Sequence, residues 1–265
     1  MKNFLKHKQM KKWFSLPVDK FDEYIPRVDV KDSGYLYYKD NGSDVLAVAH
    51  LDSVQKPEHL FITDKYIFSP VLDDRLGVYI IMDLLPKLGI NVDILFTNGE
   101  ETGFSTAELF KPDKKYNWMV EFDRMGDDVV MYDYETENYK EKIKEFFPKT
   151  SWGSFSDISY LEHLGCFGFN IGVGYQDYHQ INAYADISML LKNVRNFSKF
   201  YKKYKNVKLE HTERAEKYDG HYNDYNYEYG CWICGRPLLT PVEKQSAYCE
   251  EHYHEVYGEE GYLYY

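Results

Sequence analysis

Five short groups of histidine and acidic residues are spread along the chain, most of them directly after a run of apolar residues. In chain order the groups are His50 with Asp52, Asp73 with Asp74, Glu100 with Glu101, Asp123, and His179. Zinc prefers imidazole nitrogen and carboxylate oxygen, and a pair of zinc ions needs about five protein ligands, one of them a bridging carboxylate. The series supplies these ligands and leaves one carboxylate to act as a base. Because two metals about 3.5–4 Å apart commonly activate water against an amide, the residues indicate a hydrolase.

Apolar runs predict the strands that would carry these groups. Runs 44–49, 91–97 and 118–122 have the length and continuity of strands buried on both faces. We also expect strands at 129–132 and 166–173, a hairpin at 61–68, and helices at 74–86, 138–147, 156–164 and 186–204. This alternation predicts an α/β fold with three layers, α/β/α, around a mixed, mostly parallel sheet. In such sheets functional residues gather at the carboxyl ends of the strands, where these groups stand.

Composition limits the class of protein. A chain of 265 residues with 44% hydrophobic residues can form one substantial domain and a small appendage. Its net charge of −11 gives little support for binding nucleic acid. No run approaches the roughly 20 apolar residues that cross a bilayer, and the lysine-rich start lacks a signal-peptide core. The few cysteines do not suggest a secreted disulfide framework, so we expect a soluble cytoplasmic protein.

The motifs as they stand resemble those of a known superfamily. The runs AVAHLDSV, VLDDRLGVYI, LFTNGEETG, VEFDR and GVGYQDYHQINAYADI resemble, in the same order, the motifs of the co-catalytic zinc exopeptidases. That superfamily includes bacterial leucyl aminopeptidases, peptidase T and glutamate carboxypeptidases. The resemblance covers roughly residues 44–200. It implies two catalytic zinc ions and a peptide or other amide as substrate; cobalt and manganese accept the same ligands.

The resemblance also implies a role for each residue. The metal ligands would be His50, Asp73, Glu101, Asp123 and His179. Asp73 would bridge the two metals, with a cis peptide bond to Asp74, and Asp52 would orient the ring of His50. Glu100 would be the general base, which takes a proton from water and later delivers it to the leaving amine.

Spacing favours one branch of the superfamily. The 22 residues between His50 and Asp73, and the 55 between Asp123 and His179, are too few for an inserted domain of roughly 100 residues. The chain therefore resembles the lid-less, single-domain aminopeptidases. Three functions stay open: an aminopeptidase-like exopeptidase, an amidohydrolase or deacylase acting on a non-peptide amide, and a catalytically idle core that acts as a binding protein. Retention of Glu100 argues against the third, because a base that is not a ligand can be lost without loss of the metals.

Two further residues allow two interpretations each. Asp157 either supports the site or caps the helix that follows it. Arg124 either holds a substrate carboxylate or pairs with Asp127, and we favour the ion pair.

A second metal site is predicted in the tail. Two close pairs, Cys231 with Cys234 and Cys249 with His252, have the ligand types and spacing of a structural zinc knuckle, with His254 as a rival fourth ligand. We expect a catalytic domain at residues 1–205, a linker at 206–230 and the knuckle at 231–265. The acidic, tyrosine-rich surroundings favour a protein partner or self-association through this tail.

Overall fold

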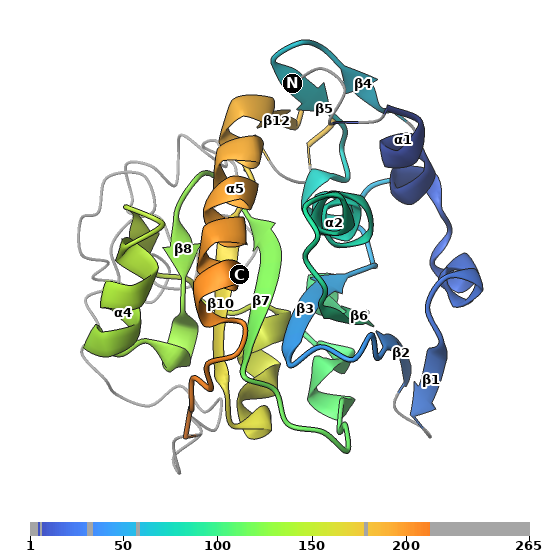
Figure 1. Cartoon of the computed structure of the whole chain (residues 1–265). Helices are drawn as coiled ribbons and strands as arrows, with labels where there is room; N and C mark the ends of the chain where they lie inside the picture. The colour runs from blue at the N-terminus through green and yellow to red at the C-terminus, as the bar shows by residue number, and fades with distance from the viewer. Residues whose placement is uncertain (1–4, 6, 31–33, 57–58, 178–179, 213–265) are drawn as a thin grey trace, which may run out of the picture. The chain divides into compact units, whose positions relative to one another are not determined.

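The computed structural model describes residues 5, 7–30, 34–56, 59–177 and 180–212 (Figure 1). The predicted knuckle and most of the predicted linker lie outside the described residues, so these two parts of the domain organisation stay predictions. None of the helices in the described ranges has the length and apolar character that crossing a bilayer requires.

An eight-stranded sheet forms the centre of the fold, in the order β1-β2-β6-β3-β7-β10-β8-β9. Its strands are β1 (Arg27–Val30), β2 (Gly34–Lys39), β3 (Val45–His50), β6 (Asp93–Thr97), β7 (Trp118–Arg124), β8 (Val129–Val130), β9 (Thr150–Ser151) and β10 (Phe167–Gly172). Strands β6, β3, β7 and β10 are parallel, whereas β1–β2, β2–β6 and β8–β10 are antiparallel pairs. The prediction of a mixed, mostly parallel sheet is confirmed.

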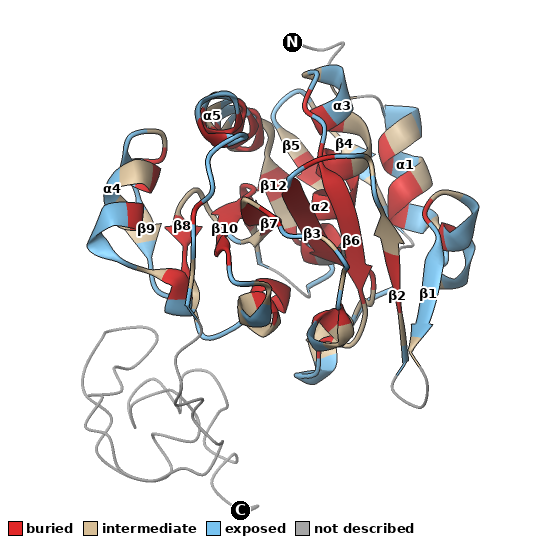
Figure 2. Cartoon of the chain, turned by 60° about the horizontal axis from the view of Figure 1, so that its bottom comes forward, coloured by how far each residue is buried: buried red, intermediate tan, exposed pale blue. Residues whose placement is uncertain are grey.

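Helices cover both faces of this sheet (Figure 2). The α-helices are α1 (His7–Ser15), α2 (Leu72–Tyr79), α3 (Leu85–Lys87), α4 (Glu137–Lys144) and α5 (Ile187–Tyr204). The tighter 3₁₀ turns include η1 (Val18–Glu23), η3 (Glu100–Thr102), η4 (Thr106–Leu109), η5 (Tyr132–Tyr134) and η6 (Asp157–Leu164). Alternation along β7 assigns the faces: Trp118 and Phe122 make ring contacts with Phe197 of α5, while Glu121 accepts a hydrogen bond from Ser156 beside η6.

The helix predicted at 74–86 begins two residues early and is not uniform. It runs as α2, then as a π turn, η2 (Ile80–Leu84), and then as the short α3 that contains Pro86. Its residues from Leu76 to Ile81 are buried, as the broad apolar pattern predicted.

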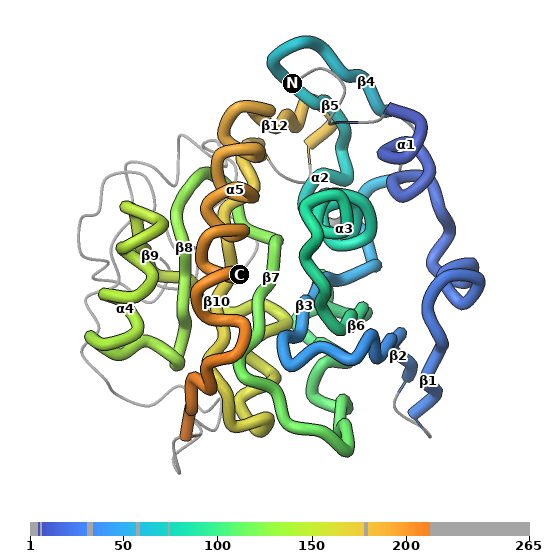
Figure 3. The backbone as a smooth tube through the Cα atoms, viewed as in Figure 1, coloured from blue at the N-terminus to red at the C-terminus, as the bar shows by residue number. Residues whose placement is uncertain are grey.

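A second, smaller sheet was only half predicted. Its order is β11-β12-β5-β4, with β4 (Phe61–Ile62), β5 (Tyr66–Phe68), β11 (Tyr175–Gln176) and β12 (Tyr184–Asp186). The hairpin of β4 and β5 is confirmed, and β12 pairs with β5 although more than a hundred residues separate them in sequence (Figure 3). Strands of two or three residues are too short to show a periodic pattern, which explains why this pairing was missed.

Gly77 brings α2 into close contact with the sheet. A Cβ atom at this position would lie 2.7 Å from the carbonyl oxygen of Phe122 and 3.4 Å from the Cβ of Ala49. Phe122 precedes Asp123, and α2 carries Asp73 in its first turn. The glycine therefore sets the separation between the two elements that carry these acids.

Replacing Gly77 by alanine should move α2 away from β7. We expect the free energy of unfolding to fall by about 1–3 kcal/mol, because a backbone carbonyl cannot yield as a flexible side chain does. This loss should appear although alanine favours a helix by about 1 kcal/mol over glycine. Urea unfolding measures it, with exposed Lys199→Ala in α5 as a control expected within about 0.5 kcal/mol of wild type. A Gly77→Ala protein as stable as wild type would show that the contact does not restrain α2.

Candidate metal centre

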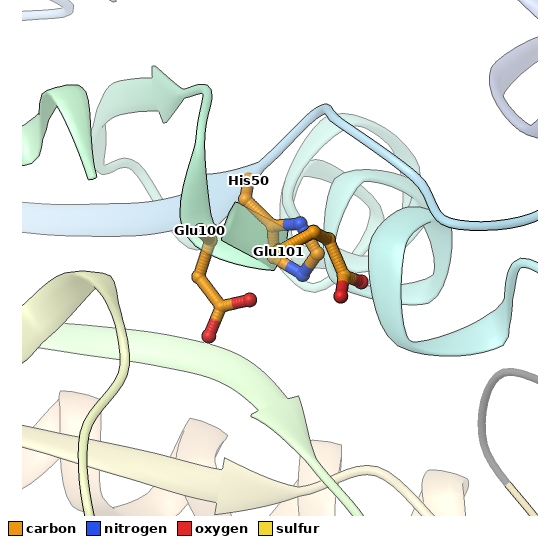
Figure 4. A group of neighbouring side chains, drawn as sticks. All are labelled: His50, Glu100 and Glu101. Atoms are coloured by element: carbon orange, nitrogen blue, oxygen red, sulfur yellow. The ribbon is translucent and has the colours of Figure 1, made fainter. Parts of the chain in front are cut away.

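Three predicted site residues meet at the carboxyl end of the central strands. His50, Glu100 and Glu101 each place one ligand atom within 4.8 Å of the other two (Figure 4). His50 is the last residue of β3 and is 1% exposed, whereas both glutamates are half-buried. Their closeness follows from the sheet, because β3 and β6 are parallel neighbours with His50 opposite Thr97.

A glycine turn places the two glutamates beside His50. Gly99, just after β6, has a φ of +85°, and a Cβ atom there would lie 2.3 Å from the carbonyl oxygen of Phe104. Only glycine fits this conformation, and the carbonyl of Gly99 accepts a hydrogen bond from the amide of Phe104 (3.0 Å). The turn ends the strand as predicted and begins η3.

Both ring nitrogens of His50 face carboxylates. Nδ1 lies 3.7 Å from Asp52 Oδ1, and Nε2 lies 3.4 Å from Asp123 Oδ1. The other oxygen of Asp52 accepts a hydrogen bond from the amide of Glu101 (3.1 Å). Asp52 therefore links the imidazole to the glutamate segment. Burial would raise the pKa of Asp52, but His50 and the amide of Glu101 bring it below its ordinary value.

Burial, and to a lesser extent neighbouring negative charge, disfavours the ionised forms of two acids at this edge. Burial, reinforced by the negative charge of Asp123, raises the pKa of Glu100 to about 8. Burial also raises the pKa of Asp123 to about 6, although the neighbouring His50 acts to lower it. Within the described part of the chain, Asp52 Oδ1 and Asp123 Oδ1 are buried and have no hydrogen-bond partner. Buried carboxylate oxygens beside an imidazole, without donors, are suited to a divalent metal ion.

Asp73 lies near this group but outside the tight cluster. Its side chain is 6% exposed in the first turn of α2, close enough to Asp123 to act against ionisation of that acid. No peptide bond among the described residues is cis, so the expected cis bond between Asp73 and Asp74 is wrong. The reason is local: α2 already begins at Leu72, and its first amide–carbonyl bond, from Arg75 to Val71 (3.1 Å), spans this peptide.

Other predicted ligands lie outside the described residues. These are His179 of the catalytic series and Cys231, Cys234, Cys249 and His252 of the tail. Strands β11 and β12 flank the segment that contains His179, and β12 pairs with β5, which leads into α2 and Asp73.

Arg124 is part of an ion pair, as the favoured interpretation held, but with a different partner. It donates to both oxygens of Asp128 (2.6 and 3.1 Å), which lies four residues later, after the end of β7. Asp127 instead accepts a hydrogen bond from Lys149 (2.8 Å).

A buried acid next to the site, Glu121, was missing from the residues predicted from the sequence. Glu121 is fully buried on β7, on the same face as Asp123, and accepts a hydrogen bond from Ser156 (2.5 Å). Burial raises its pKa well above the ordinary value. Its position two residues before a predicted ligand in a strand was the available signal. Asp157, left open between two interpretations, is also fully buried and accepts hydrogen bonds from Thr97 and Ser105.

Comparison with known families decides the class. Residues 36–222 match the sequence model of peptidase family M28, well over half of the chain. The chain belongs to peptidase family M28. It is therefore an aminopeptidase-like hydrolase of a zinc peptidase family, and membership implies co-catalytic metal ions. No curated protein sequence matches the chain significantly.

Solved structures show the same fold. The aminopeptidase PepT of Bacillus cereus is 12% identical, with 73% of this chain and 91% of that chain covered, at a TM-score of 0.53. An aminopeptidase of the archaeon Desulfurococcus kamchatkensis is 13% identical, with 78% and 96% covered, at 0.53. A tripeptidase of Staphylococcus aureus is 13% identical, with 74% and 90% covered, at 0.51. At these identities the similarity establishes the fold.

Zinc should stabilise the metal-free protein through this cluster. A cation that binds only the folded chain stabilises it by about 4 kcal/mol at 1,000 times its dissociation constant. We expect His50→Ala to lose most of this gain. Thermal unfolding of chelator-treated protein, with and without added zinc, measures it. His59→Ala is the control, because His59 is exposed and is not part of the cluster. Equal stabilisation of His50→Ala and wild type would exclude His50 as a ligand.

Proposed function

We propose that this protein is a di-zinc exopeptidase that removes residues from the amino terminus of peptides. The observation that carries the proposal is the convergence of His50, Glu100 and Glu101 in a chain of family M28. Asp123 and Asp52 stand against the same imidazole from the neighbouring strand and loop, which is the arrangement expected for one metal ligand and one orienting residue.

The metal ligands of this proposal come from five places in the chain. His50 and Asp123 would hold one zinc ion, Glu101 and His179 the other, and Asp73 would bridge them. A zinc pair in this position makes a water molecule acidic near neutral pH and stabilises the negative charge that develops on the substrate carbonyl oxygen. Asp52 keeps the imidazole of His50 in a fixed orientation through its contact with Nδ1.

Glu100 is the proposed general base. It lies beside Glu101 in η3 and is half-buried, so part of the residue is accessible to water. It takes a proton from the attacking water and delivers it to the amine that leaves. Without metal, burial and the charge of Asp123 raise its pKa to about 8. Bound divalent ions would lower this pKa and so favour the ionised carboxylate that takes the proton.

Glu100→Gln should retain its zinc and lose activity. Proton transfer by a positioned side chain contributes about 10²–10⁴-fold, so we expect kcat to fall by that factor. Hydrolysis of aminoacyl anilides and elemental analysis of zinc test this on wild type and variant. Glu108→Gln, an exposed glutamate in η4, is the matched control and should behave as wild type.

The same assay separates the alternatives. Unchanged turnover in Glu100→Gln would remove this residue from the mechanism. Cleavage of acylated amines but not of peptides by wild type would favour a deacylase. Zinc-loaded wild type that cleaves no amide would favour a binding protein with an idle core. Loading with cobalt or manganese in parallel identifies the metal that supports the highest rate.

We also propose a structural zinc site in the tail, formed by Cys231, Cys234, Cys249 and His252. Its support is the chemistry of two close ligand pairs, which together leave no open position on a tetrahedral ion. A piece of this size lacks the apolar area to fold alone, so a metal would supply its stability. A cytoplasmic location would keep these thiols reduced, and the tail would serve contacts with a protein partner or a second copy.

Cys231→Ser should lower the zinc content by one ion per chain and leave peptide cleavage near that of wild type. The reason is that thiolate ligands dominate the binding energy of such sites, while the tail carries none of the proposed catalytic residues. Zinc content and anilide hydrolysis are the measurements, with Cys166→Ala as the control because Cys166 lies buried in the catalytic unit. Alanine variants of His252 and His254 identify the fourth ligand. A collapse of activity in Cys231→Ser would mean that the tail supports the active site.

A further inference from the structure

The 3₁₀ turn η6 makes repeated contacts with the segment that carries Glu100 and Glu101. Asp157 accepts hydrogen bonds from Thr97 (2.5 Å) and from Ser105, which stand on either side of residues 98–104. A single carboxylate therefore ties the two ends of that segment together. Asp157 is fully buried, so water does not compete for these bonds.

Two more residues of η6 contact the same region at regular spacing. The hydroxyl of Tyr160 donates to the carbonyl of Gly103 (2.9 Å), near the tip of the segment. His163 Nε2 lies 2.8 Å from the carbonyl oxygen of Phe110, at the end of η4. A 3₁₀ helix has three residues per turn, so residues 157, 160 and 163 lie on one face. That face contacts the chain from Thr97 to Phe110 at its start, at its tip and at its end.

The other contacts of the segment are also polar. Thr102, Gly103 and Phe104 are exposed, Phe104 by 79%. At its start, the amide of Asn98 donates to Thr106 (3.0 Å) and its side chain donates to the carbonyl of Tyr35 (3.4 Å), and further along the amide of Glu101 donates to Asp52 (3.1 Å). Polar contacts, rather than burial of apolar side chains, therefore determine where η3 lies.

The residue before Asp157 contacts the neighbouring ligand-bearing strand. Ser156 donates to Glu121 (2.5 Å), which precedes Asp123 by two residues on the same face of β7. In the sheet, β6 and β7 are separated by β3. Adjacent residues 156 and 157 thus connect the two strands on either side of His50.

We propose that the face of η6 formed by Asp157, Tyr160 and His163 positions the Glu100–Glu101 segment for catalysis. Asp157 is the main positioning residue and acts through Thr97 and Ser105, without contact with the substrate. The inference rests on the proposed role of Glu100 as base. In this proposal η6 does more than cover the sheet. Loss of its contacts would loosen the base, Glu100, and the metal ligand, Glu101, together.

The test compares two tyrosine variants that each lose one hydroxyl. Tyr160→Phe removes the bond to Gly103. Tyr139→Phe is the matched control, since Tyr139 is partly buried and donates to the carbonyl of Glu210, away from the site. One hydrogen bond is worth about 0.5–1.5 kcal/mol, so amide hydrogen exchange of residues 98–104 should accelerate about two- to tenfold in Tyr160→Phe. The control should leave that exchange at the wild-type rate.

Asp157 variants extend the series. Asp157→Asn keeps the shape and one acceptor and should give an intermediate effect, while Asp157→Ala should give the largest. In each folded variant kcat should fall with KM nearly unchanged, and zinc affinity, measured by competition with a chelator, should fall because Glu101 is displaced. If Asp157→Ala does not fold, Ser105→Ala takes its place in the series, because it removes one of the two hydrogen bonds that Asp157 accepts.

Hydrogen exchange separates this inference from the proposed function, because it needs no substrate. Wild-type exchange of residues 98–104 in folded Tyr160→Phe and Asp157→Asn would overturn the positioning role, whatever the activity. If Glu100→Gln is inactive while these variants keep the wild-type kcat, the proposed function stands and the positioning role is wrong. Faster exchange with no peptide cleavage by wild type would keep the positioning role and reject the function.

Discussion

The unfavourable free energy of placing several carboxylates in a partly buried site around His50 is the constraint on which the rest of this structure depends. Asp52, Asp123, Glu100 and Glu101 surround the imidazole of His50, and Asp73 lies close by. Two like charges 4 Å apart repel by about 4 kcal/mol at an effective dielectric constant of 20, and burial raises the pKa of Glu100 to about 8. A divalent cation offsets this repulsion. The residues that weaken the metal-free fold are therefore the ones that give the site its affinity.

The opposite end of β6 shows what a purely structural buried acid looks like. Asp93 is completely buried, yet Lys114 (2.7 Å), Tyr116 (3.0 Å) and the amides of Asn41 (2.8 Å) and Ser43 (3.0 Å) all donate to it. Its charge is compensated within the protein, so no ligand is required. At the carboxyl end of the sheet, Asp52 and Asp123 each keep a buried oxygen without a donor among the described residues. The buried oxygens at the two ends therefore differ in their hydrogen-bond partners.

Sequence reasoning succeeded where a local pattern determines the geometry. An apolar run followed by His50 or Asp123 predicts a strand end, and parallel neighbours bring such ends together without any knowledge of side-chain contacts. It failed where residues far apart in the sequence meet. The side-chain hydrogen bonds of Ser156 with Glu121 and of Thr97 with Asp157, and the pairing of the short strands β5 and β12, produce no periodic pattern in the sequence. Arg124 shows the intermediate case, since an ion pair was foreseen but the partner depends on the path of the chain.

The centre combines two kinds of support, and the difference follows from chemistry. His50 and Asp123 sit on strands, where backbone register holds them rigidly and burial excludes water. Glu100 and Glu101 follow a glycine turn and are half-buried, which gives a proton-transferring group access to water and substrate. A segment with such access cannot be held by apolar packing, so its position has to come from side-chain hydrogen bonds that reach it from outside. The face of η6 and the carboxylate of Asp52 make such hydrogen bonds, and through them the segment that carries Glu100 is connected to the rigid strands.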